Sequence, residues 1–365
     1  AKIFCVNGDY LADISAVGIL DAMMGETYDY DISPVINAQN LVIADLPTFV
    51  SENEEEMQKR YSQSAQAVYQ EIVWPSLTSI ASRTGAKMTC MMTPQFTYTD
   101  EEEPDGENVT YYLKRLKEEH AEAGLSADSM EGIPLSEKIK QDQTFWQTYA
   151  PSYRFLSLYA DGVKSIGEKS ALPAEIRTVA LGSGASGQAV GYLNENVTLQ
   201  PSTSSGIRHT FLDDFKVKCM ETALGYSNIT LDLYSVTYPE GDEDSWEKMS
   251  KKIAANLGTY WKAYEAFDAT TLTESDVRIR RFLALDYKQQ RAGNVITLSL
   301  EHREDAAWFL LRLHGEKVTE VAGGSFEEIE DGVYLILAEE DEVSVEVQTG
   351  ETWQYQDGGK RGDGT

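Results

Sequence analysis

Short apolar runs alternate with segments of helical spacing over the first 290 residues. Residues 2–6 form a strand-like run that ends at the polar residues Asn7, Gly8 and Asp9. Between Ser51 and Pro75, apolar residues recur at every third or fourth position, which predicts an amphipathic helix. Further strands are predicted at 87–93, 154–159, 176–181, 197–200 and 229–236, and further helices at 109–122, from 244 and from 273. This alternation indicates a mostly parallel sheet, open or closed into a barrel.

After Gly293 the apolar period shortens to two. Apolar and polar residues alternate at 295–300 and again at 343–347, with strand-like runs at 308–313 and 333–337 between them. Such alternation is typical of antiparallel strands that are covered on one face. We therefore predict an α/β barrel over residues 1–290, a small antiparallel β-sandwich over 293–350 and a loose polar tail over 351–365.

The charge of the chain narrows the range of partners. With 60 acidic and 31 basic residues, the formal net charge is −29. A surface of this sign repels phosphate backbones and anionic membranes, so no nucleic acid is expected as a partner. It suits solubility, or attraction to a cationic polymer. Because no run of about 18 apolar residues occurs, we expect no membrane insertion by this segment, and any anchor would lie outside it.

Cysteine and histidine offer little metal chemistry at the sequence level. Three cysteines cannot all pair with one another, and each lies in apolar sequence, so we expect buried thiols. The four histidines are His120, His209, His302 and His314, and none is spaced three to five residues from another. Only His209 follows a predicted barrel strand, on the side where parallel barrels build their sites.

The segment around His209 leaves two interpretations open. Arg208 and Asp214 lie beside it, and a carboxylate near a histidine can orient the imidazole as a general base. Alternatively, Asp213 or Asp214 simply caps the following helix. Tyr238, which follows the strand at 229–236, belongs to a segment that could line a ligand cleft or simply cap the helix from 244.

Several segments resemble known carbohydrate-active proteins. Residues 3–10 stand where polysaccharide deacetylases of carbohydrate esterase family four carry an Asp-Asp motif, and residues 83–89 are similar to their Gly-Ala-Lys-Ala-Thr strand entry. The chain more closely resembles the uncharacterised deacetylase-like domain found in Pel-type exopolysaccharide loci. The segments that carry this second resemblance are 7–9, 34–38, 225–226, 244–246, 282–287 and 309–312.

The resemblance implies a metal site that has lost its ligands. In the deacetylases, one aspartate is the general base, and a second aspartate joins two histidines on a divalent metal. In the register set by residues 3–10, the second aspartate is Asp9, while Ser126 and Met130 replace the histidines. A hydroxyl and a thioether are poor substitutes for imidazole around zinc. Asp9 is then the only retained candidate ligand, with Asp128 as a candidate helper, and the catalytic arginine is absent near Pro201.

Two functions follow from the resemblance, and we favour the first. The chain is a degenerate polysaccharide-deacetylase-like domain that binds or scaffolds an amino-sugar exopolysaccharide during its synthesis or export, without a cofactor. Alternatively, it is an active deacetylase or hydrolase of N-acetylhexosamine polysaccharide with an altered site, in which one divalent metal such as zinc could take part. Candidate catalytic residues are Asp9 and His209. Candidate substrate-binding residues are Asn7, Ser126, Asp128, Arg208, Asp214 and Tyr238.

The same resemblance implies a cellular setting. Partners would be a polysaccharide and exopolysaccharide synthesis proteins of a biofilm-forming bacterium. The expected location is extracellular or at the cell surface, as part of a longer anchored protein.

Overall fold

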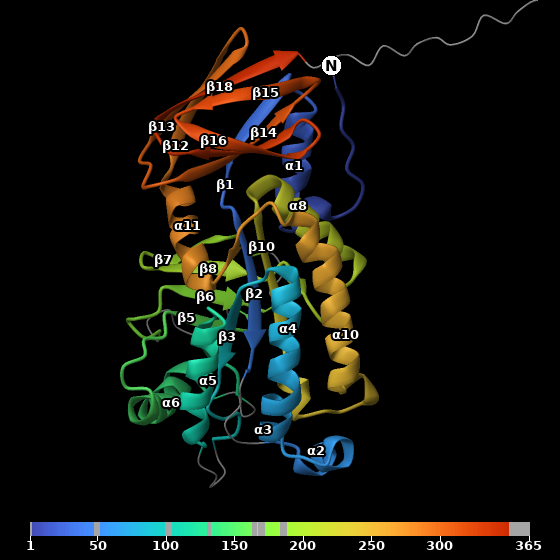
Figure 1. The fold of residues 1–365 in the computed structure, drawn as a ribbon, viewed down its shortest axis with the longest axis vertical. Coiled ribbons are helices and arrows are strands. Elements are labelled where there is room, and N and C mark those ends of the chain that lie inside the picture. The colour runs from blue at the N-terminus through green and yellow to red at the C-terminus, as the bar shows by residue number, and fades with distance from the viewer. Residues whose placement is uncertain are drawn as a thin grey trace, which may run out of the picture. The chain divides into compact units, whose positions relative to one another are not determined.

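A mostly parallel β-sheet forms the centre of the larger part of the chain in a computed structural model (Figure 1). The structure describes residues 2–46, 52–98, 104–129, 133–162, 166, 172–182 and 188–349. It divides into two compact units: the first unit contains residues 1–23 and 35–283, and the second unit contains residues 24–34 and those from 284 onward. Residues 24–34, which the sequence placed in the barrel, thus belong to the second unit.

The sheet of the first unit has ten described strands. Its order is β7-β8-β6-β5-β4-β3-β2-β10-β9, and β11 also pairs with β2. Only β7 runs antiparallel to its neighbour. The strands are β2 (Ala38–Ala44), β3 (Met88–Met92), β4 (Glu122–Ser126), β5 (Ser157–Ala160), β6 (Thr178–Leu181), β7 (Gly191–Asn194), β8 (Val197–Pro201), β9 (Ser204–Ser205), β10 (Tyr226–Asp232) and β11 (Ala269–Thr270).

Helices follow most of these strands, as the alternating pattern predicts. The α-helices are α1 (Ala16–Gly25), α2 (Glu54–Tyr61), α3 (Ala65–Val68), α4 (Trp74–Thr84), α5 (Glu107–Glu118), α6 (Leu135–Tyr149), α8 (Phe211–Leu224), α9 (Tyr234–Thr237), α10 (Trp246–Asn256) and α11 (Leu272–Ala284). Short 3₁₀ or π segments are η1 (Tyr10–Ala12), η2 (Tyr69–Val73), η4 (Asp242–Asp244), η5 (Leu257–Trp261) and η6 (Lys262–Tyr264).

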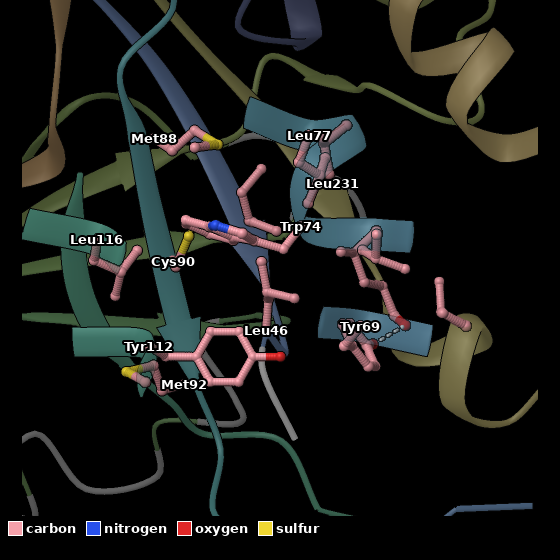
Figure 2. Close-up of a cluster of buried hydrophobic side chains, with 14 of the residues drawn as sticks. Leu46, Tyr69, Trp74, Leu77, Met88, Cys90, Met92, Tyr112, Leu116 and Leu231 are labelled. Atoms are coloured by element: carbon pink, nitrogen blue, oxygen red, sulfur yellow. Dashed lines mark hydrogen bonds between the residues drawn. The ribbon is translucent and has the colours of Figure 1, made fainter. Parts of the chain in front are cut away.

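Apolar side chains on one face of the sheet pack against helices. Leu41 and Ile43 of β2 belong to the same core cluster as Trp74 of α4 and Trp246 of α10. Their neighbours Val42 and Ala44 belong to a separate cluster. This is the two-residue period of a strand that is buried on both faces. Figure 2 shows part of the first cluster, in which the hydroxyl of Tyr69 donates a hydrogen bond of 3.1 Å to the carbonyl of Leu233.

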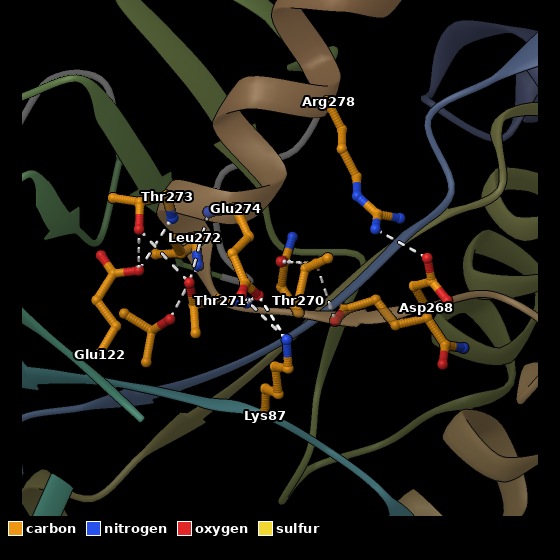
Figure 3. A network of polar contacts seen from close by, with 12 residues as sticks. Lys87, Glu122, Asp268, Thr270, Thr271, Leu272, Thr273, Glu274 and Arg278 are labelled. Atoms are coloured by element: carbon orange, nitrogen blue, oxygen red, sulfur yellow. Dashed lines mark hydrogen bonds and ion pairs between the residues drawn. The ribbon is translucent and has the colours of Figure 1, made fainter. Parts of the chain in front are cut away.

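The amino end of α11 forms hydrogen bonds with the amino ends of β3 and β4 (Figure 3). Glu122, the first residue of β4, accepts hydrogen bonds from the backbone N–H and the hydroxyl of Thr273, at 3.0 and 2.7 Å. Thr89 of β3 accepts from the N–H of Leu272 at 3.0 Å. Lys87 pairs with Glu274 at 2.9 Å. These contacts satisfy the exposed donors of the first helical turn and occupy the amino edge of β3 and β4.

Three local predictions are wrong. Residues 2–7 form no strand, and Ile3 is 88% exposed. The first described strand of the central sheet is instead β2, so the register that was set on Asp9 does not hold. The helix expected between Ser51 and Pro75 is interrupted at Ser62, which is left-handed (φ 54°), and Pro75 lies in the first turn of α4 rather than at a helix end. The strand expected at 229–236 ends at Asp232, after which α9 begins.

Cysteine burial is as expected at two of the three positions. Cys90 and Cys219 are buried, and burial raises the pKa of both thiols. Cys5 is exposed, contrary to the prediction, because the segment that carries it does not join the sheet.

The second unit contains two antiparallel sheets. One has the order β1-β14-β17-β16 and the other β12-β13-β18-β15. The alternating residues predicted at 295–300 and 343–347 are buried in one core with side chains of β14 and β17. The strands are β1 (Tyr30–Val35), β12 (Asp286–Ala292), β13 (Val295–Glu301), β14 (Ala307–Leu313), β15 (Glu316–Ala322), β16 (Gly324–Glu330), β17 (Val333–Ala338) and β18 (Glu342–Thr349). The tail predicted from 351 lies outside the described residues.

Candidate functional site

Acidic residues follow four strands of the central sheet at their carboxyl ends. Asp45 follows β2, Asp128 comes two residues after β4, Asp161 follows β5, and Asp232 is the last residue of β10. Carboxyl ends of parallel strands meet at one edge of a sheet, which is where such folds build their sites. We call these four residues the aspartate cluster.

Asp45 is held in place by its neighbour on β4. The side chain of Asp45 is 1% exposed and accepts a hydrogen bond of 2.6 Å from the hydroxyl of Ser126. The Ser126 oxygen in turn accepts from the backbone N–H of Asp128 at 3.2 Å. The backbone of Asp45 is left-handed, with φ at 57°, a conformation that aspartate tolerates better than most residues. Through Ser126, these contacts join Asp128 to Asp45.

The crowding of these carboxyls raises their pKa values. Burial, followed by the charges of Asp128 and Asp232, raises the pKa of Asp45 well above its usual range. Loss of solvation, followed by the charges of Asp232 and Asp161, raises the pKa of Asp128 to about 7. Two neighbouring carboxyls whose charges repel each other cannot both ionise cheaply, so they titrate as a pair. The Asp45–Asp128 pair therefore holds a proton near neutral pH.

The ends of β5 and β6 approach the same cluster. The phenol of Tyr159 is buried, and burial followed by the charge of Asp128 raises its pKa. A Cβ on Gly182 would lie 2.7 Å from a carboxylate oxygen of Asp161 and 2.8 Å from the Tyr159 hydroxyl. Glycine at this position leaves room for these two polar groups.

Three aromatic residues lie beside the aspartate cluster. Phe96, in the loop after β3, contacts Tyr234 and Tyr238 edge to face, with ring centroids 5.0 and 5.8 Å apart. The two tyrosines stack on each other at 4.9 Å. The backbone N–H of Tyr234 donates to Asp232 at 2.9 Å, which joins this aromatic cluster to the aspartates. Phe96 is buried, whereas both tyrosines are partly exposed and can offer an edge or face to a ligand.

Some of the residues predicted from the sequence meet at this edge. Ser126 and Asp128 belong to the network around Asp45, and Tyr238 belongs to the aromatic cluster. Loss of solvation raises the pKa of Asp232, and the positive charge of Arg208, which is itself exposed, opposes this rise.

Other predicted residues lie elsewhere. Asn7 and Asp9 are exposed in the segment before α1, and Asp9 precedes η1 without capping it through its side chain. Asp214 pairs with Lys218 at 2.9 Å, while Asp213 forms a capping box with Thr210 at the start of α8. The helix-cap interpretation of this segment is thus confirmed for Asp213. Met130 lies outside the described residues.

The side chain of His209 is packed against neighbouring residues and does not point freely into solvent. Its ring stacks on Tyr260 with centroids 3.5 Å apart, and its Nδ1 lies 2.8 Å from the hydroxyl of Ser204, which is itself buried. Partial burial lowers the pKa of His209, and the charges of Asp213 and Asp214 oppose this. Its second nitrogen, Nε2, is buried without a hydrogen-bond partner in the described part of the chain. No carboxylate bonds to the imidazole within that part, so the orientation expected of a general base is not seen.

The donor set at the strand ends does not fit the divalent metal of the deacetylases. Within the described ranges, no group of three or more His, Cys, Asp or Glu side chains has the arrangement of a metal site. Asp45 accepts a hydrogen bond from Ser126, and burial raises the pKa of both Asp45 and Asp128, so the pair offers a divalent cation less negative charge than two free carboxylates.

Sequence reasoning missed Asp45, which is the central residue of the site. The sequence does contain a signal: the apolar run at 41–44 ends in Asp45, Leu46 and Pro47. In addition, no described helix is long and apolar enough to cross a membrane.

Comparison with known proteins gives only distant similarities. No protein-family model matches the chain, and no curated protein does. A structure from Mycobacterium smegmatis, provisionally named a polysaccharide deacetylase, is 9% identical and covers 66% of this chain and 90% of its own, with a TM-score of 0.40. One from Parabacteroides distasonis, provisionally named a glycoside hydrolase/deacetylase, is 10% identical and covers 76% and 82%, with a TM-score of 0.41. The Bc1960 peptidoglycan N-acetylglucosamine deacetylase is 11% identical and covers 66% and 87%, with a TM-score of 0.29.

Proposed function

We propose that the first unit binds an amino-sugar polysaccharide at the carboxyl edge of its sheet. The observation that carries this proposal is the aspartate cluster directly beside the aromatic cluster. Sugar recognition commonly combines aromatic faces, which pack on C–H groups, with a few polar side chains that fix orientation. Asp161 and Asp232 are exposed, so their carboxylates can pair with the ammonium group of a deacetylated hexosamine.

The charge of the whole chain favours the same class of ligand. A formal net charge of −29 attracts a cationic polymer over distances of about 10 Å at moderate salt. In this proposal the chain is a degenerate deacetylase-like domain that holds an exopolysaccharide during synthesis or export at the cell surface. The resemblance of its segments to the domain of Pel-type loci supports that setting.

Calorimetric titration with two oligosaccharides tests the binding proposal. We expect a glucosamine tetramer to bind more tightly than an N-acetylglucosamine tetramer, because only the former carries ammonium groups. Substitution Asp232→Asn should weaken glucosamine binding about tenfold, which corresponds to about 1.4 kcal/mol. Asp214→Asn is the matched control, since Asp214 pairs with Lys218 and belongs to neither cluster. Equal affinity for both tetramers, or an equal loss of affinity in the Asp232→Asn and Asp214→Asn variants, would contradict the proposal.

Hydrolysis is a second candidate, favoured by the Asp45–Asp128 pair. A carboxyl with a pKa of about 7 can donate a proton to a leaving group, or accept one from water, at neutral pH. Incubation with N-acetylated and deacetylated oligomers, assayed for new reducing ends and for acetate, tests this candidate. Activity that disappears in Asp128→Asn would support it. Absence of both products from wild-type protein would leave binding alone.

A further inference from the structure

A cavity of about 640 Å³ lies beside α6, outside the site described above. Leu125 of β4 and Ile139 of α6 line it, and both pack on the core cluster that contains Leu158 of β5. Side chains alternate along a strand, so Leu125 points away from the face on which its neighbour Ser126 bonds to Asp45. The cavity therefore lies across β4 from the aspartate cluster, with Ser126 between the two.

The walls of this cavity are largely apolar. Leu125, Ile139 and Leu172 line it and are only partly buried. Trp146 and Phe155, whose ring centroids are 4.7 Å apart, also line it and are almost fully buried. Cavities of about 300–1,000 Å³ with apolar walls and a few polar groups are typical of small-molecule sites. The apolar part of a ligand would remove the partly buried side chains from water, which is favourable.

The lining also contains two exposed side chains of opposite charge. Arg154 precedes β5 and Glu175 precedes β6, and within the described part of the chain neither forms an ion pair or a side-chain hydrogen bond. The two segments lie side by side, because the N–H of Arg177 donates to the carbonyl of Leu156 at 2.7 Å. Since Arg154 and Glu175 do not pair with each other, both charges remain available to a ligand.

We propose that this cavity binds an α-amino acid with a large apolar side chain. The side chain would fill the apolar part of the cavity, the carboxylate would pair with Arg154, and the ammonium would pair with Glu175. The third charged residue of the lining, Asp142, already pairs with Lys138 at 2.6 Å and adds no free charge. A zwitterion matches one free cation and one free anion, whereas a ligand with a single charge leaves one of them unmatched. This inference does not depend on the proposed function.

An NMR titration with L-phenylalanine tests the inference, with the indole N–H of Trp146 as the reporter inside the cavity. This resonance, assigned by comparison with Trp146→Phe, should move along a saturable isotherm below about 20 mM, because ligands of this size commonly bind in the millimolar range. Two analogues isolate the charges: phenylethylamine lacks the carboxylate, and 3-phenylpropionate lacks the ammonium. Each should bind about fivefold more weakly than L-phenylalanine, as expected for one partly exposed ion pair.

Two variants assign each charge of the ligand to its partner. Arg154→Gln should weaken the binding of L-phenylalanine and 3-phenylpropionate about fivefold and leave that of phenylethylamine unchanged. Glu175→Gln should weaken the binding of L-phenylalanine and phenylethylamine and leave that of 3-phenylpropionate unchanged. Both side chains are exposed, so both variants should fold. Arg177→Gln is the matched control, because Arg177 is exposed nearby and does not line the cavity.

The outcomes separate this inference from the proposed function. An unmoved Trp146 resonance, equal affinities for the three ligands, or an equal loss in the Arg154→Gln and Arg177→Gln variants would overturn it. Movement of Trp146 with the glucosamine tetramer but not with L-phenylalanine would show that the cavity takes a glycan, which also overturns it. Saturable binding of L-phenylalanine, together with no affinity of the wild type for either tetramer, upholds this inference and refutes the binding proposal.

Discussion

Glu221 is a fully buried carboxyl of the first unit. It lies on α8 with no exposed area, accepts a hydrogen bond of 3.1 Å from Gln39, and has a second oxygen without a hydrogen-bond partner among the described residues. Burial raises its pKa to about 7. A protonated carboxyl at this place needs no counter-ion, which explains how the core tolerates it.

This glutamic acid should make stability depend on pH. Its folded-state pKa is raised, so its contribution is complete below about pH 4.5 and is lost as the pH rises through 7. The loss amounts to about 3 kcal/mol of unfolding free energy for a shift of this size. Urea unfolding of Glu221→Gln at pH 5 and pH 8 should show a smaller decrease than the wild type. Glu137→Gln, at an exposed position, should follow the wild type, and an unchanged decrease in Glu221→Gln would contradict the assignment.

At the same scale, the sequence predicted part of the site. Ser126 and Asp128 were identified because their segment resembles the histidine segment of the deacetylases. Asp45 was not identified, because Asp9 also ends a strand-like run. The resemblance to the deacetylase Asp-Asp motif was therefore assigned to Asp9. The local apolar pattern does not distinguish residues 2–6, which are exposed, from residues 38–44, which are buried on both faces. The burial of residues 38–44 depends on the pairing of β2 with β3 and β10, which lie far along the chain.

Among the elements, α1 and α8 approach closely through a glycine. A Cβ on Gly18 would lie 2.4 Å from the Cα of Cys219, a distance at which the backbone must move. Only glycine allows this separation, since the contact is with backbone and not with the end of a flexible side chain.

Gly18→Ala should therefore destabilise the protein. We expect a loss of about 1–3 kcal/mol, typical of overpacking in a core. Gly258→Ala is the matched control, because a Cβ there meets nothing within 4 Å and the better helix propensity of alanine favours it. Denaturant unfolding of both variants measures the difference. Equal stability of the two would mean that α1 does not pack on α8 as described.

The element predictions succeeded where the apolar period was regular. Strands β3, β6 and β8 and the alternating strands of the second unit were predicted within a few residues. Between Ser51 and Pro75 a single helix was predicted, but the structure has the separate helices α2 and α3 there. Ser62 ends α2 and Ser64 caps α3, although the apolar pattern continues through both. The π segment at Tyr69–Val73 precedes Pro75, whose ring nitrogen has no hydrogen to donate.

For the whole molecule, the large negative charge should make glycan binding sensitive to salt. Raising the ionic strength shortens the range of electrostatic attraction. Between 50 and 500 mM sodium chloride, the affinity for a glucosamine tetramer should fall severalfold, while that for the N-acetylated tetramer should change little. Calorimetric titration in both salt concentrations measures this, and a parallel fall for both tetramers would show that charge does not select the ligand.

The central claim is that the aspartate cluster forms the glycan site, and carboxyl ¹³C NMR during titration with a glucosamine tetramer tests it most directly. We predict that the resonances of Asp128 and Asp232 move with the binding isotherm, while that of Asp214, which pairs with Lys218, stays in place. Saturable binding that leaves Asp45, Asp128, Asp161 and Asp232 all unmoved would contradict the account.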